Sequence, residues 1–113
     1  MQPITVVRGT TRGIGVTVYD ENGELYTLGS GEVLRFGVKK EPQDADYLIK
    51  LETTTRDSEG AYIFSLVPSN TLSLPCGRYY YDIGLKSGTN YYNVVECSYF
   101  DIAFNITDVN MTV

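Results

Sequence analysis

The side chains that most often carry out catalysis are scarce in this sequence. Histidine is absent, which removes the commonest general base and metal ligand, and with it any Ser-His-Asp or Cys-His arrangement within the chain. The two cysteines, Cys76 and Cys97, are too few to fill a four-ligand zinc site. We therefore expect no catalytic residue, no cofactor and no metal site. We interpret the cysteines as small strand residues, and the sequence leaves open whether they pair.

Acidic residues gather in three short polar stretches, residues 20–24, 44–46 and 57–59. The first resembles a calcium-binding loop, but it lacks the alternating oxygen ligands and the distal bidentate glutamate of such a loop. We expect all three stretches to be solvated turns. The first is predicted to be a hairpin turn, because Asn22-Gly23 tolerates the positive φ angles that a tight hairpin requires.

Tyrosine is the one residue type in excess. There are 10 tyrosines among 113 residues, and six of them lie between Tyr79 and Tyr99. Because successive strand residues point to opposite faces, Tyr80 should point away from the core, and so should one of Tyr91 and Tyr92. The residues suit a half-buried aromatic ladder, a protein–protein contact or stacking against a glycan. We take Tyr80, Tyr91 and Tyr92 as the candidate contact surface.

The elements that position these side chains are predicted to be strands. Apolar and polar residues alternate along the chain, and turn residues separate the alternating segments. About seven to nine short strands indicate an all-β, antiparallel β-sandwich of the immunoglobulin type, with a closed barrel as the alternative. We expect one domain over residues 1–106 and a C-terminal tail over 107–113. The expected strands cover residues 4–7, 14–18, 25–28, 33–40, 47–52, 61–67, 78–86 and 91–106.

Two of these segments carry finer expectations. In the segment 47–52, Tyr47 is expected to share a face with Ile49 and Leu51. In the last segment, apolar residues occupy odd positions up to Cys97 and even positions through Ile106. A β-bulge near residues 98–99 would bring both halves of that strand onto one face of a sheet.

The most specific stretch joins two predicted strands, at residues 66–83. A strand ends, a link bounded by prolines crosses between sheets, and a glycine precedes a strand that opens with tyrosine. Immunoglobulin-like folds place a tyrosine at this corner, where its hydroxyl bonds to nearby backbone and its ring fills the core. Tyr79 or Tyr81 suits that role.

The same stretch resembles one that recurs in small proteins of phage tails, and it is similar to the N-terminal domain of phage baseplate upper proteins. The matching residues are Leu66-x-Pro68-x-x-Thr71-x-x-Leu74-x-x-Gly77-x-Tyr79-x-Tyr81-Asp82-Ile83, Val33-x-x-Phe36-x-Val38-Lys39-Lys40 and Phe100-x-Ile102. The resemblance implies an immunoglobulin-like module built into a virion tail or baseplate by contact with neighbouring proteins. It implies no catalytic residues, and the chain lacks the long helical and receptor-facing parts of that family.

Charge and composition narrow the partners further. A formal net charge of −5, with 9 basic against 14 acidic residues, disfavours binding to a nucleic-acid backbone. We see neither a membrane span nor a secretory signal, and expect synthesis in a host cytoplasm followed by assembly into a virion, as a homo-oligomer or with other virion proteins. The alternative is a β-sandwich that binds carbohydrate or a cell surface, with Asn90, Asn93 and Asp82 beside the tyrosines.

Overall fold

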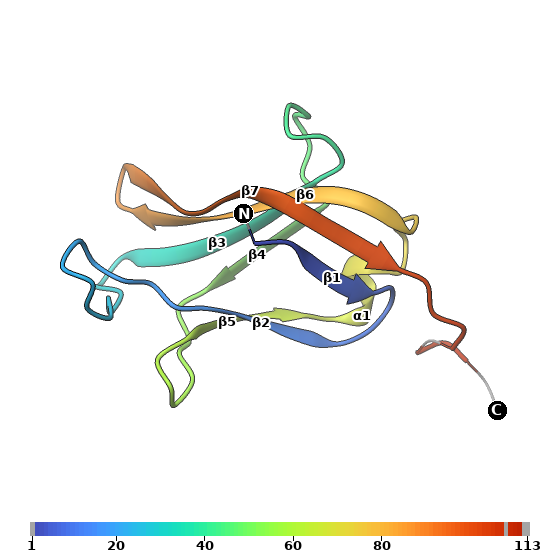
Figure 1. Ribbon diagram of the computed structural model, residues 1–113, viewed down its shortest axis with the longest axis horizontal. Helices are drawn as coiled ribbons and strands as arrows, with labels where there is room; N and C mark the ends of the chain where they lie inside the picture. Colours follow the sequence, from blue (N-terminus) through green and yellow to red (C-terminus); the bar gives the residue numbers. More distant parts are fainter. Residues whose placement is uncertain (1, 108, 112–113) are drawn as a thin grey trace.

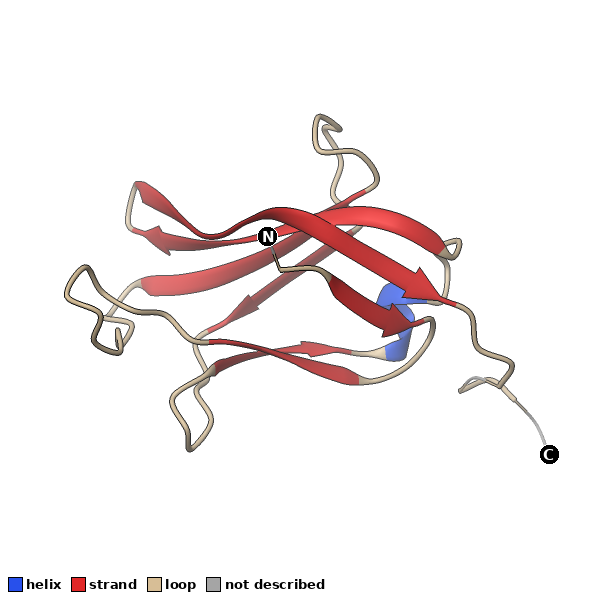
Figure 2. Ribbon diagram, viewed as in Figure 1, coloured by secondary structure: helices blue, strands red, loops and turns tan. Residues whose placement is uncertain are grey.

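A computed structural model describes residues 2–107 and 109–111 of the chain. These residues form a mostly-β fold of seven strands and one short helix (Figures 1 and 2). The strands are β1 (Ile4–Val7), β2 (Arg12–Val16), β3 (Glu32–Lys39), β4 (Ile49–Thr53), β5 (Tyr62–Leu66), β6 (Gly77–Ser87) and β7 (Asn90–Ala103), and the helix is α1 (Pro68–Thr71). No helix among the described residues is long and apolar enough to cross a membrane.

The strands form two sheets of unequal size. Five strands make a curled half-barrel in the order β1-β7-β6-β3-β4, and β2 pairs with β5 in a separate two-stranded sheet beneath it (Figure 1). The larger sheet is mixed, because β1 runs parallel to β7 with Ile4 opposite Phe100. The expected antiparallel immunoglobulin sandwich is therefore not clearly formed. β1 and β7 lie near opposite ends of the sequence, so their pairing depends on the fold of the whole chain. The local alternation of apolar and polar residues does not encode whether two strands run parallel or antiparallel.

The space between the two sheets holds the apolar core. The alternation expected in β3, β5 and β6 is confirmed, since the apolar residues at alternate positions of each strand are buried. Phe36 of β3 lies at the centre, with ring centroids 5.6 Å from Phe64, 5.3 Å from Tyr81 and 5.9 Å from Phe100. Aromatic contacts thus join the large sheet to the small one.

Three strand predictions need correction. Residues 25–28 form no strand, and only an isolated bridge between Tyr19 and Leu25 closes the predicted hairpin turn. The pairing of β6 with β7 shifts register twice, between Ser98 and Val95 and again between Val95 and Asn93 on β7, so the predicted bulge lies just before residue 98 and a second shift adjoins it. The last strand ends at Ala103, so the apolar residues beyond it leave the sheet.

The corner before β6 has the predicted tyrosine. Tyr79 is 2% exposed, and its hydroxyl donates a hydrogen bond to the backbone carbonyl of Pro75, four residues upstream. Tyr81 is also buried, and its hydroxyl donates to the carbonyl of Gln2. The link itself contains the helical turn α1, where the buried Thr71 accepts a hydrogen bond from the backbone of Gly9 at 2.7 Å. The link therefore ties the end of β1 to the entrance of β6.

Candidate functional site: the outer face of the large sheet

The face of the large sheet that is turned away from β2 and β5, here called the outer face, carries polar side chains from four strands. Cross-strand pairing arranges its residues in rows. One row places Lys50, Gly37 and Asp82 side by side across β4, β3 and β6. The neighbouring row contains Glu52, Arg35, Gly84 and Asn93.

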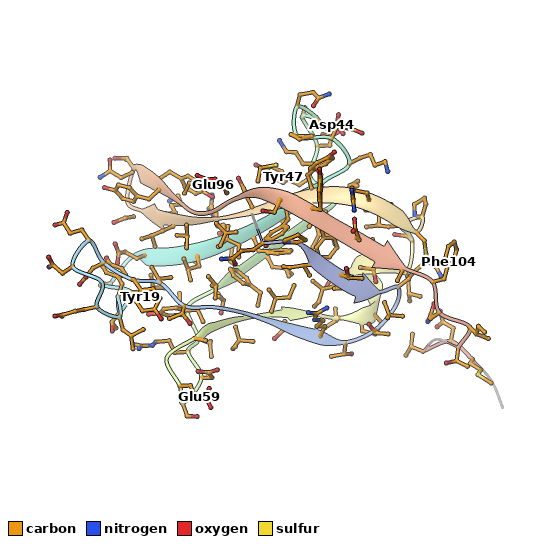
Figure 3. All side chains as sticks on the ribbon, in the orientation of Figure 1. Tyr19, Asp44, Tyr47, Glu59, Glu96 and Phe104 are labelled. Carbon is orange, nitrogen blue, oxygen red and sulfur yellow. The ribbon has the colours of Figure 1, made fainter. Side chains whose placement is uncertain are left out.

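Two glycines leave room for tyrosine rings on this face. A Cβ atom at Gly37 would lie 2.9 Å from Cε1 of Tyr47, and one at Gly84 would lie 2.0 Å from the hydroxyl oxygen of Tyr91. Neither glycine has a positive φ. Glycine is therefore required at these positions because it has no side chain, and not because of its backbone conformation. Figure 3 shows Tyr47 above the sheet on the side away from β5.

The rings and the polar rows enclose a groove, here called the outer groove. Its volume is about 680 Å³, and a smaller cavity of about 210 Å³ adjoins it. The two share Gly37, Tyr47 and Asp82, so Asp82 lies where they meet. The other residues with polar side-chain groups that line the outer groove are Arg35, Lys50, Glu52 and Tyr91.

Asp82 is the most unusual charged group in the groove. Its carboxylate is half-buried, and loss of solvent raises its pKa above the ordinary value, while the nearby charge of Lys39 opposes that shift. Among the described residues, none donates a hydrogen bond to this carboxylate. The pKa of Tyr91 is also raised, by burial and then by the charge of Asp82, so the Tyr91 hydroxyl stays a proton donor at neutral pH.

Several of the other charged groups around the groove already have partners, and Lys50 is the exception among the described residues that line it. Arg35 pairs with Glu52, with 2.6 Å between Nε and Oε2. The Lys39 ammonium lies 4.6 Å from the ring centroid of Tyr47, a cation–π contact. The groove therefore offers donors and acceptors together with aromatic surface, and carries no cluster of free cations.

A second group of side chains on the same face is tightly interlocked. Arg78 donates two hydrogen bonds to Asp101, at 2.9 and 3.1 Å, and its guanidinium lies 3.9 Å from the ring centroid of Tyr99. Tyr80 packs edge-on against Tyr99, with 5.6 Å between centroids. The group resembles the aromatic ladder that the sequence suggested more than an open binding site.

The structure separates the three tyrosines proposed as a contact surface. Tyr80 points outward as expected, but it is half-buried against its neighbour. Tyr91 lies on the outer face and is 54% exposed. Tyr92 is opposite Leu85, on the other face of the β6–β7 hairpin, and is 55% exposed. These three residues therefore do not form one continuous surface.

Tyr47 is a residue of the outer face that the sequence pattern did not indicate. It was expected on the core side with Ile49 and Leu51, but β4 begins only at Ile49, and Tyr47 folds back over the sheet with 52% of its surface exposed. The alternation of a strand does not reach a residue outside it. The available signal was Gly37, a glycine within an otherwise bulky strand, which often marks the close approach of another group.

The remaining candidate groups form local structure. Asp20 accepts hydrogen bonds from the backbone of Asn22 and Glu24, at 2.9 and 3.0 Å, as a turn residue does. The cysteines are not bonded to each other. Within residues 2–107 and 109–111, no three acidic or cysteine side chains are grouped so that they could hold a metal ion.

No known protein family matches the chain. No curated protein sequence matches it either.

Proposed function

We propose that the chain is a non-enzymatic structural module that acts through protein–protein contacts. The observation that carries the proposal is an exposed apolar end of the molecule, here called the apolar end. Phe104 is 87% exposed and Ile106 is fully exposed, and both follow β7 directly. Val7, opposite Ala103 in the parallel pairing, is a further exposed residue at this end (Figure 1).

The physical argument concerns apolar surface that the fold leaves in water. Fully burying a Phe or Ile side chain contributes roughly 1.5–3 kcal/mol, and the domain does not obtain this contribution from Phe104 or Ile106. Contiguous exposed apolar groups on a soluble protein commonly mark a contact with another molecule. A neighbouring protein that covers the apolar end would gain that free energy.

The setting we propose is a phage or prophage virion, in the tail or baseplate, after synthesis in the host cytoplasm. Its support is the resemblance of residues 66–83 to phage baseplate upper proteins. The finer fold assignment, an immunoglobulin-like sandwich, belongs to the same proposal. The buried Tyr79 at the corner before β6 and the packing of two sheets around one core support it.

Tyr92 supplies a second contact position in this proposal. It lies on the β6–β7 hairpin, at the opposite end of the sheet from the end of β7 (Figure 1). Contacts at two opposite ends suit head-to-tail association, which closes into a ring when the rotation between neighbours allows it. Such rings, or mixed contacts with other virion proteins, are the assemblies we propose.

The test is the mass of the purified chain, measured by size-exclusion chromatography with light scattering across a wide range of concentration. We expect an oligomer whose mass depends on concentration, and we expect Phe104→Ser combined with Ile106→Ser to return it to a monomer. Leu48→Ser is the matched control, because Leu48 is 42% exposed and lies between β3 and β4, at neither the apolar end nor the β6–β7 hairpin (Figure 1).

A monomer at every concentration would exclude self-assembly, and a second measurement then decides the proposal. A photo-crosslinking amino acid in place of Phe104, introduced in the cells that express the protein, should capture a specific neighbour. If the chain is monomeric and position 104 captures nothing beyond what position 48 captures, the proposal is wrong.

A further inference from the structure

The outer groove contains a hydrogen-bond acceptor that lacks donors from the protein. Asp82 is half-buried at the junction of the two cavities, and its cross-strand neighbour on β3 is Gly37, which has no side chain to offer. A carboxylate that loses water without gaining hydrogen bonds destabilises the fold. The oxygens of Asp82 still reach solvent, so water supplies their hydrogen bonds in the free protein, and a ligand with hydroxyl groups can replace that water.

Two tyrosine rings flank this carboxylate in fixed positions. Tyr47 and Tyr91 each lie against the backbone of a glycine, which restricts where the ring can go, and each still exposes about half of its surface. A ring held in place before binding loses little conformational entropy when a ligand packs on it. Aromatic surface beside a carboxylate suits a ligand that has both C–H faces and hydroxyl groups.

Further polar groups complete a mixed set of donors and acceptors. Lys50 is two strands away from Asp82 in the same row, with only Gly37 between them. Asn93 lies opposite Gly84, next to the ring of Tyr91. Because Arg35 is already neutralised by its pair with Glu52, no cluster of free positive charge remains to prefer an anion.

We propose that the outer groove binds a neutral saccharide, with a sugar ring packed against Tyr47 or Tyr91 and a sugar hydroxyl donating a hydrogen bond to the Asp82 carboxylate. The volume of about 680 Å³ falls in the range of small-ligand sites. A phosphorylated or otherwise anionic ligand would be repelled by Asp82 and by the net charge of −5. This site lies apart from the apolar end, so it does not depend on the assembly proposed above.

The experiment is a titration of the isotope-labelled, full-length protein with neutral oligosaccharides, followed by amide chemical shifts in NMR spectra. The probes are tetrasaccharides of glucose, galactose, mannose and N-acetylglucosamine, with the glucose polymer in both its α- and β-linked forms. Each is added to about 10 mM, which detects dissociation constants in the millimolar range. We expect at least one probe to shift amides around Gly37, Asp82 and Gly84.

Three variants identify the groups that act. Tyr91→Ala and Asp82→Asn should each weaken binding of that probe by about tenfold, the change expected when one good contact worth about 1.4 kcal/mol is lost. Tyr19→Ala should leave the affinity unchanged, because this equally exposed tyrosine lies outside the groove. Thermal unfolding of each variant shows whether the fold is intact.

The outcomes separate clearly. Shifts confined to the outer groove, with affinity lost in folded Tyr91→Ala and Asp82→Asn, support the proposal. It is overturned if no neutral probe shifts these amides, if the shifts lie elsewhere on the molecule, or if Tyr19→Ala weakens binding as much as Tyr91→Ala. Binding of an acidic oligosaccharide alone, such as tetragalacturonate, would also overturn it.

Discussion

The ring of Tyr91 lies directly on the backbone of Gly84 in the neighbouring strand. A Cβ atom at position 84 would be 2.0 Å from the Tyr91 hydroxyl oxygen and 2.2 Å from Cζ, closer than any real contact. Tyr91 is opposite Lys86 in register, so it reaches Gly84 diagonally across the strand pair. Tyrosine and glycine therefore form one unit, in which the ring covers backbone that would otherwise face water.

We predict that Gly84→Ala moves the Tyr91 ring off the sheet. The clashing atoms are the far end of a surface side chain, so the ring should swing outward while the strands stay in place. The free energy of unfolding should fall by about 1 kcal/mol, the low end of the range for overpacked sites. Chemical denaturation measures this change, and the ring protons of Tyr91 should shift toward free-tyrosine values.

The same substitution should have the opposite effect when the ring is absent. In a Tyr91→Ala background, Gly84→Ala should be neutral or stabilising by up to about 1 kcal/mol, because alanine loses less conformational entropy than glycine in a strand. Gly13→Ala is the control, since a Cβ there meets Ile63 at 3.4 Å. Equal effects of Gly84→Ala in both backgrounds would show that the tyrosine and the glycine are not coupled.

Local patterning was enough to find most of the strands. Every second residue of β3, β5 and β6 faces the core as the alternation predicts, because a half-buried strand needs one apolar face. The tyrosine corner was also found, since the residues that make it lie within one short stretch of sequence. The pairing of β1 with β7 was not found, because it joins residues almost 100 positions apart and depends on the rest of the fold.

The candidate site was predicted only in part. Alternation placed Tyr80 on the outer face, but it could not show that the ring packs against Tyr99. Asp82 was named as a binding group only in the alternative of carbohydrate binding, because its burial depends on Gly37 in another strand and on the ring of Tyr47. Groups brought together by four strands and a loop have no signature in any one segment.

We predict that Tyr79→Phe lowers stability although the ring stays buried. The change removes the hydrogen bond to the Pro75 carbonyl, and that part-buried carbonyl then lacks its donor. The expected loss is about 1–2 kcal/mol in the free energy of unfolding. Tyr19→Phe is the control, because Tyr19 is 60% exposed. A loss no larger than in the control would mean that the hydrogen bond from Tyr79 to Pro75 makes no net contribution to the free energy of unfolding.

Truncation to alanine should lower the stability of the fold strongly at one phenylalanine and hardly at all at another. Phe36 is 1% exposed and contacts three other rings, so Phe36→Ala should destabilise the fold by about 3–5 kcal/mol. Phe104 is 87% exposed, and Phe104→Ala should change the stability of the isolated protein by less than about 0.5 kcal/mol. Thermal and denaturant unfolding of both variants give the comparison. A large loss for Phe104→Ala at low concentration would show that the domain itself buries this side chain.

Asp82 and Asp101 should titrate on opposite sides of the ordinary aspartate pKa of 3.8. The hydrogen bonds from Arg78 hold the pKa of Asp101 low, so Asp101 adds stability above 3.8 that is lost as the pH falls through its lower folded-state pKa. Loss of solvent raises the pKa of Asp82, so its protonated form is favoured and stability declines as the pH rises from 3.8 through its folded-state value. Carboxyl ¹³C shifts followed from acid to neutral pH measure both.

Two substitutions test the causes of these shifts. Arg78→Met should return the pKa of Asp101 toward 3.8 and leave Asp82 unchanged, because the guanidinium is the largest cause of the Asp101 shift. Lys39→Met should raise the pKa of Asp82 further, since the lysine charge is what opposes desolvation there. If Asp82 titrates at or below 3.8 in the unmodified protein, its carboxylate is not desolvated, and the argument that it awaits a donor in the outer groove fails with it.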